Sequence, residues 1–231
     1  MKNIKKHLEE LRNLKREKYH SLIHKIHKKH KISKKTLFYV KEYGEKSKAF
    51  KTIIKESVKI LLLASIISSL GGFAIENIKN YFILIMPLII LLPTLNDMLG
   101  DYGTIISSRF STMLHEGKIK KNFLKNKELK ELIFQIFIIA LIMGFFSIVA
   151  ALTISNFFGY NASINIAVKI IIIILVDIIL LVGILFLISI IGGLYFYRKG
   201  EDPNNFLIPI TTSVADLGNM MILLILLTLF F

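Results

Sequence analysis

Six carboxylate and carboxamide side chains lie inside stretches of this chain that are apolar enough to cross a lipid bilayer. They are the aspartates Asp97, Asp101, Asp177 and Asp216 and the asparagines Asn96 and Asn219. A carboxylate at membrane depth is costly unless a cation or a partner neutralises it, so each such acid is a functional-site hypothesis. Oxygen ligands of this kind suit a hard divalent cation such as Mg²⁺.

The first group lies between Leu92 and Gly103. Asp97 and Asp101 are four residues apart and share one helix face with Pro93, and Asn96 is adjacent. Proline and glycine in such a place predict a break from Pro93 to Gly103 that frees backbone carbonyls toward a cavity. The alternative is that both acids occupy a water-filled vestibule or a helix N-cap and bind nothing.

The second group centres on Asp216. Thr212 lies one turn before it and Asn219 one turn after it, which predicts an oxygen-rich stripe on one helix face. Pro209 removes an N–H and is expected to free carbonyls near the stripe. The alternative, an acid that reaches the membrane surface, is disfavoured because Asp is short and lies about ten positions into the apolar run.

Asp177 stands alone in an almost wholly aliphatic run over residues 168–181. Lys169 is two helical turns away, too far for a direct pair on the helix surface. An isolated acid in this setting should face the interior of a helix bundle. The sequence leaves two options open: Asp177 lines an ion pathway, or it pairs with Arg109.

The bulk composition indicates an all-α, polytopic membrane protein. The chain has 231 residues, 54% of them hydrophobic, and its mean hydropathy is +0.61. Apolar runs predict five transmembrane helices of roughly 20 or more residues each. Their expected ranges are 57–76, 81–114 with the break at 93–103, 129–155, 164–197 and 206–231, with a short loop at 76–80. The lipid bilayer is therefore an expected partner.

The positive charge is concentrated at the start of the chain. Residues 1–59 hold 19 Lys and Arg against 6 Asp and Glu, which accounts for nearly all of the net charge of +14. We interpret residues 1–50 as a basic amphipathic cytoplasmic segment that lies on anionic lipid, and residues 51–231 as the membrane domain. A nucleic-acid partner is not expected, because aromatic residues are sparse among the basic ones. The chain has no cysteine, so thiolate metal sites are excluded.

Loop charges predict the orientation in the cell membrane. The basic segments 1–56, 115–128 and 198–205 alternate with the less charged segments 76–80 and 155–163. The positive-inside rule then places the N-terminus in the cytoplasm and the C-terminus outside.

Two stretches resemble the signatures of MgtE-type magnesium transporters and their animal solute-carrier relatives. PTLNDMLGDYGTIISSRFSTMLHEG, from Pro93 to Gly117, is similar to the second-span signature, although Asp101 stands where asparagine is usual. DPNNFLIPITTSVAD, from Asp202 to Asp216, resembles the fifth-span signature. The resemblance covers about residues 50–231 and concerns the membrane domain only.

This resemblance implies a transporter of divalent cations, most of all Mg²⁺, whose pore lies on the axis of a homodimer. Asp216 would bind the hydrated ion on that axis, together with Thr212 one turn upstream. Nothing before Val58 resembles the acidic cytoplasmic sensor of bacterial MgtE proteins, so that gating mechanism is not implied. The chain is not expected to be an enzyme. The alternatives are a membrane prenyltransferase, suggested faintly by Asn96, Asp97 and Asp101, and a membrane anchor for the basic segment.

Overall fold

The described part of the chain is helical throughout and contains no strand. The structure is a computed structural model that describes residues 10–11, 16–32, 36–37, 49–119, 126–199 and 201–231. Its helices are α2 (Arg16–His30), α4 (Ala49–Leu84), α5 (Met86–His115), α6 (Lys127–Phe157), α7 (Ile164–Lys199) and α8 (Pro203–Phe230). The all-α prediction is therefore confirmed.

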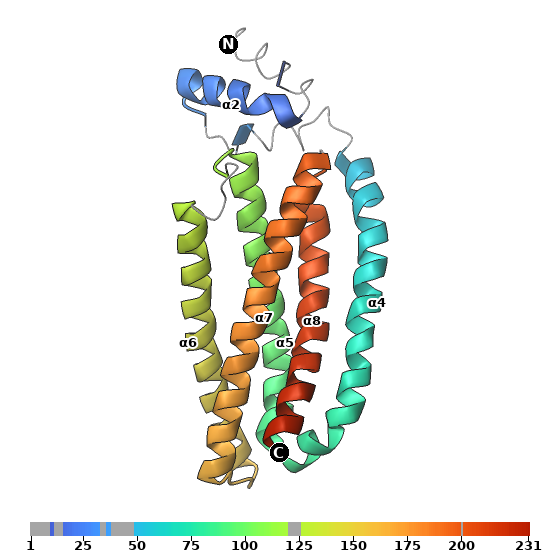
Figure 1. The fold of residues 1–231 in the computed structure, drawn as a ribbon, viewed down its shortest axis with the longest axis vertical. Coiled ribbons are helices and arrows are strands. Elements are labelled where there is room, and N and C mark those ends of the chain that lie inside the picture. The colour runs from blue at the N-terminus through green and yellow to red at the C-terminus, as the bar shows by residue number, and fades with distance from the viewer. Residues whose placement is uncertain (1–9, 12–15, 33–35, 38–48, 120–125, 200) are drawn as a thin grey trace.

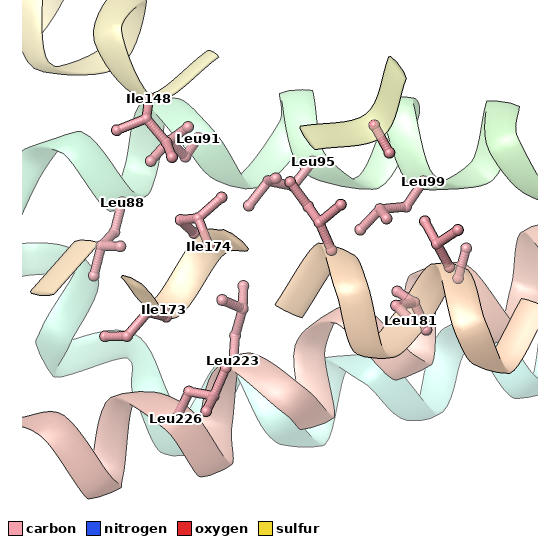
Figure 2. Packing of buried hydrophobic residues seen from close by; sticks show 14 of the residues in the cluster. Leu88, Leu91, Leu95, Leu99, Ile148, Ile173, Ile174, Leu181, Leu223 and Leu226 are labelled. Atoms are coloured by element: carbon pink, nitrogen blue, oxygen red, sulfur yellow. The ribbon is translucent and has the colours of Figure 1, made fainter. Parts of the chain in front are cut away.

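Five long helices, α4 to α8, lie side by side, and α2 lies across one end of them (Figure 1). Helix α8 packs against α4, α5 and α7, while α5 also packs against α6 and α7. Aliphatic side chains at spacings of three and four fill the space between α5, α7 and α8 (Figure 2). They include Leu88, Leu91, Leu95 and Leu99 on α5, Ile173, Ile174 and Leu181 on α7, and Leu223 and Leu226 on α8.

Four of the described helices are long and apolar enough to cross a membrane. They are Ser57–Leu84, Lys127–Phe157, Ile164–Lys199 and Pro203–Phe230. The last three match the expected spans 129–155, 164–197 and 206–231 to within a few residues. Helix α5 is of similar length but carries Asp97, Asp101 and Arg109, and it does not belong to this apolar set. The chain is thus a multi-pass membrane protein.

The predicted loop at residues 76–80 is wrong, because α4 continues through it to Leu84. The polar side chains there are satisfied locally: the Asn77 amide donates to the Phe73 carbonyl at 2.7 Å, and Lys79 pairs with Glu76 one turn earlier. Such local partners let polar residues stay helical. The chain turns instead at Ile85, and the C-terminal part of α4 bends toward the N-terminal end of α5 (Figure 1).

The predicted break from Pro93 to Gly103 is also wrong, because α5 is helical from end to end. Pro93 costs the helix one backbone hydrogen bond without interrupting it. Gly103 serves close packing: a Cβ atom built there would lie 3.0 Å from the Thr211 Cβ and 3.3 Å from its backbone carbon. The glycine therefore allows α5 and α8 to approach closely rather than opening the helix.

Local signals in the sequence define the helix ends next to the functional region. Gly117 has φ +67° just after α5, and the Lys118 N–H donates to the Met113 carbonyl at 3.0 Å, which closes the helix in a Schellman motif. The Asp202 carboxylate accepts a 3.0 Å hydrogen bond from the Asn204 N–H and caps the start of α8. These caps fix where α5 ends and where α8 begins.

Candidate cation site on α5 and α8

A polar pocket of about 350 Å³ lies between the middle of α5 and the middle of α8. It is lined by Asn96, Asp97, Gly100, Asp101, Thr104, Thr212 and Asp216. Five of the seven site residues predicted from the sequence thus line one pocket: Asn96, Asp97, Asp101, Thr212 and Asp216. The two sequence groups come together because α5 and α8 pack against each other.

Asp216 is half-buried and is held from a third helix. The Ser68 hydroxyl of α4 donates to Asp216 Oδ2 at 2.9 Å. Thr212, one turn earlier, donates its hydroxyl to the Ile208 carbonyl at 3.0 Å, so its oxygen can still accept a hydrogen bond from a water molecule in the pocket. The α8 side of the pocket therefore presents oxygen acceptors.

Asp97 and Asp101 form the α5 side of the pocket and are both exposed. Gly100 lies between them, and a Cβ atom built there would meet nothing within 4 Å. Thr104 donates its hydroxyl to the Gly100 carbonyl at 3.2 Å. The α5 side thus combines two carboxylates with an open space beside them.

Asn219, the third residue of the predicted stripe with Thr212 and Asp216, does not line the pocket. It is fully buried, and its amide Nδ2 donates to Oδ1 of Asn96. Asn219 follows Asp216 by three residues, which places it about 60° around the axis of α8. Its hydrogen bond to Asn96 shows that it faces α5. Asn219 therefore joins α8 to α5 directly behind the pocket and holds Asn96 in place.

Asp177 lies apart from the pocket, in the aliphatic core. It is 0% exposed, and among the described residues neither of its carboxylate oxygens has a hydrogen-bond partner. The alternative pairing with Arg109 is not found, since Arg109 is exposed and lines a different pocket between α5 and α6. The neighbours of Asp177 one turn away on the same face of α7, Ile173 and Leu181, belong to the core shown in Figure 2.

The prolines do not supply carbonyls to the pocket. A proline at position i leaves the carbonyl of residue i−4 without its helical donor. That residue is Ile89 for Pro93 and Asn205 for Pro209, and neither lines the pocket. The sequence-based expectation of backbone ligands beside Asp216 is therefore wrong for these two prolines.

A buried hydroxyl cluster next to the pocket was missed by the sequence analysis. Ser107 of α5 lies 3.1 Å from the hydroxyls of both Ser189 of α7 and Thr211 of α8. All three side chains are fully buried, and Thr211 also faces Gly103. Small polar residues at the same depth in three spans are the signal that could have indicated this junction, because such residues join helices in membranes.

The pocket is strongly negative for its size. Three carboxylates line it and no cationic side chain does. Among the described residues, no group of three or more His, Cys, Asp or Glu side chains is arranged to hold a bare metal ion. The pocket is large enough to admit water molecules. This arrangement fits a cation that keeps its water shell and is bound through hydrogen bonds to carboxylate oxygens.

The described helices thus form a multi-pass membrane bundle with a pocket lined by three carboxylates. A family model described as MgtE, divalent cation transporter, matches residues 92–226, which is more than half of the chain and includes every residue of the pocket. The chain belongs to the MgtE family of divalent cation transporters. No curated protein and no solved structure matches it.

Family membership confirms the resemblance found in the sequence. MgtE is a family of transporters rather than enzymes, in agreement with the expectation that this chain is not an enzyme. Nothing in the fold or the family match supports the prenyltransferase alternative.

Proposed function

We propose that the chain transports Mg²⁺ across the cell membrane through a pore on the axis of a homodimer, with Asp216 at the centre of the ion site. The observation that supports this most directly is the exposure of Asp97 and Asp101 near the middle of α5, beside Asp216. Acids at that depth cannot face hydrocarbon without a large penalty. The pocket opens on the side of the bundle, so a second protein surface is needed to separate these acids from lipid.

A second copy of the chain supplies the simplest second wall. Isologous pairing about a two-fold axis would bring two Asp216 side chains, and two sets of Asp97 and Asp101, around one polar passage. Mg²⁺ dehydrates reluctantly, so a wide passage with few carboxylates would hold the hydrated ion and still release it. Asp101 adds negative charge where asparagine is expected from the resemblance, and it is the residue through which selectivity could depart from Mg²⁺.

In this proposal α5 also crosses the membrane, as the second of five spans, despite its charges. It is long enough to cross the bilayer, and its acids would face the passage while its aliphatic face packs in the core. Helices α5 and α7 end, and α6 and α8 begin, at the α2 end of the bundle, and the C-terminus lies at the opposite end (Figure 1). A cytoplasmic α2 end would satisfy the positive-inside rule and leave the C-terminus outside.

The decisive experiment is divalent-cation flux into liposomes that contain the purified protein. We expect the wild-type chain to pass Mg²⁺, and Asp216→Ala to reduce the flux about 100-fold or more, since the axial carboxylates would be lost. Glu76→Ala is the matched control, because Glu76 is an exposed acid on α4 whose partner is Lys79. Wild-type flux in Asp216→Ala would rule out the proposed site.

The homodimer has its own test, because the natural chain has no cysteine. A single Thr104→Cys substitution places a thiol at the pocket, where two copies of α5 would face one another. We expect a disulfide-linked dimer after mild oxidation in membranes. Phe134→Cys, on the exposed face of α6, is the control and should remain monomeric. Equal cross-linking of both variants would contradict the proposed interface.

A further inference from the structure

A second pocket, of about 810 Å³, lies between α5 and α6 at the end where α5 stops and α6 begins. Its lining changes in character along the helices. The inner part is aliphatic and includes Ile105, Ile136 and Ile139. Ile105 and Ile139 are also exposed on the flank of the bundle, so this part of the pocket adjoins the lipid-facing surface. An apolar chain could enter the groove from the bilayer.

Arg109 follows next along α5 and faces this groove. It lies six residues before the end of the helix, which is about 9 Å below that end. It is exposed, and among the described residues no carboxylate lies within ion-pair distance of its guanidinium group. A cation on a lipid-facing flank requires an anion or water. Guanidinium is well shaped to bind a phosphate group through two hydrogen bonds.

Beyond Arg109 the rim of the groove carries acids that already have lysine partners. Lys118 lies 3.0 Å from Glu116 and 2.9 Å from Glu128, while Lys127 lies 3.7 Å from Glu131. Hydrogen bonds to Glu128 and then Glu116 raise the pKa of Lys118, so it stays charged at neutral pH. Arg109 is therefore the cation of the groove that lacks a described partner, and the acids are concentrated farther out.

We propose that this groove binds a phospholipid with an amine-bearing, zwitterionic headgroup, of the phosphatidylethanolamine type. Three zones of the groove match three parts of that lipid in the same order. The aliphatic zone at Ile105 and Ile139 takes part of an acyl chain, Arg109 binds the phosphate, and the outer carboxylates around Glu131 receive the ammonium group. Charge complementarity thus selects both the lipid and its orientation.

The same charges disfavour an anionic lipid here. The three glutamates of the rim have only two lysine partners among the described residues, Lys118 and Lys127, so one negative charge is left over, and a headgroup without a cation would not balance it. A choline headgroup carries the positive charge but cannot donate hydrogen bonds to carboxylates. We therefore expect affinity to decrease from phosphatidylethanolamine to phosphatidylcholine and to be lowest for phosphatidylglycerol.

The test is lipid binding to the full chain purified in detergent, followed by native mass spectrometry with the three lipids at matched chain length. Arg109→Gln should weaken phosphatidylethanolamine binding about tenfold or more, the effect of losing a charge-assisted hydrogen bond. Arg198→Gln is the matched control, because Arg198 is an exposed arginine at the same end of the bundle, in the last turn of α7. Its lipid binding should equal that of the wild type.

Two further variants separate the parts of the proposal. Glu131→Gln should reduce the preference for phosphatidylethanolamine over phosphatidylcholine. Ile139→Trp should block the aliphatic zone and lower the binding of both lipids. If Arg109→Gln does not fold, this variant still tests whether the lipid occupies the groove. Unchanged lipid binding in Arg109→Gln and Ile139→Trp would overturn the proposal, as would tighter binding of phosphatidylglycerol. The outcome does not depend on whether the chain transports Mg²⁺.

Discussion

The acids at the middle of this bundle occur in two contrasting environments. Asp97, Asp101 and Asp216 share a pocket on the flank of the chain, and Asp216 has a hydroxyl partner on a third helix. Asp177 lies in the aliphatic core and has no described partner. The residue type and the depth are similar, but only the first environment is accessible to an ion. Depth in the membrane alone therefore does not identify a transport site.

The contrast also separates two physical roles of polar groups in a membrane protein. A carboxylate that meets water or a cation keeps its charge and can act on a transported ion. A carboxyl that meets only aliphatic side chains incurs the cost of burial without a hydrogen bond. The first arrangement favours function, and the second reduces stability.

Apart from the loss of Asp216 itself, the largest effect on this comparison should come from removing both pocket acids of α5. The double substitution Asp97→Asn and Asp101→Asn eliminates two of the three carboxylates, so the attraction for a divalent cation falls sharply. We expect Mg²⁺ flux at low concentration to drop by about tenfold or more in liposomes. Asp177→Asn changes an acid at similar depth outside the pocket and should keep most of the flux. The reverse result would show that the core acid, and not the flank, carries the ion.

The next effect concerns the close approach that forms the pocket. In Gly103→Val the new side chain would collide with Thr211, including its backbone, which cannot move without shifting α8. We expect a loss of about 1–3 kcal/mol in stability, measured by thermal unfolding in detergent. Gly100→Ala is the matched control on the same helix, because its Cβ would meet nothing within 4 Å. Equal stability of both variants would contradict the packing role of Gly103.

Replacing the core acid should act in the opposite direction. Asp177→Val removes a buried carboxyl that has no described partner, and it leaves an aliphatic side chain among Ile173, Ile174 and Leu181. We expect a gain of about 1–2 kcal/mol in stability by the same unfolding assay. A clear loss of stability would mean that Asp177 makes a favourable interaction in the membrane-embedded protein.

The smallest effect is expected at Ser68. Ser68→Ala deletes the 2.9 Å hydrogen bond from α4 to Asp216, and such bonds between membrane helices contribute about 0.6 kcal/mol on average. Stability should fall by about that amount and Mg²⁺ flux should change less than about threefold. Ser69→Ala, whose hydroxyl bonds only to the Ser65 carbonyl of its own helix, is the neighbouring control. A collapse of flux in Ser68→Ala would instead make Ser68 part of the ion site.

Much of the membrane domain was predictable because apolar length is a direct physical signal. The runs that become α6, α7 and α8 are long, aliphatic and separated by polar turns. Asp97 with Asp101, and Asp216 with Thr212, were predicted as two polar groups in stretches that resemble one family, and the family match confirms the family. Neither periodicity nor composition would have predicted that α5 packs against α8.

The wrong predictions come from contacts that residue type alone does not specify, between helices at Gly103 and within α4 at Glu76. In the sequence alone, Gly103 predicts a break in the helix. In the structure it packs against Thr211 of α8, which is more than a hundred residues away in the sequence, and the helix continues through it. The polar residues Glu76 and Lys79 led to the prediction of a loop, but they form an ion pair on one face of α4. The role predicted for Asn219 stays a prediction: it donates a hydrogen bond to Asn96 of α5, which itself lines the pocket.

The open flank of the pocket has a consequence for how activity should depend on protein density. In the homodimeric pore that we propose, each chain contributes the wall made by α5 and α8, and the other wall comes from an identical chain. Complete passages are then products of a bimolecular equilibrium within the plane of the membrane. When the protein is diluted with lipid, Mg²⁺ flux per chain should decrease with the fraction of dimers, whereas a pore complete in one chain would keep its flux per chain constant.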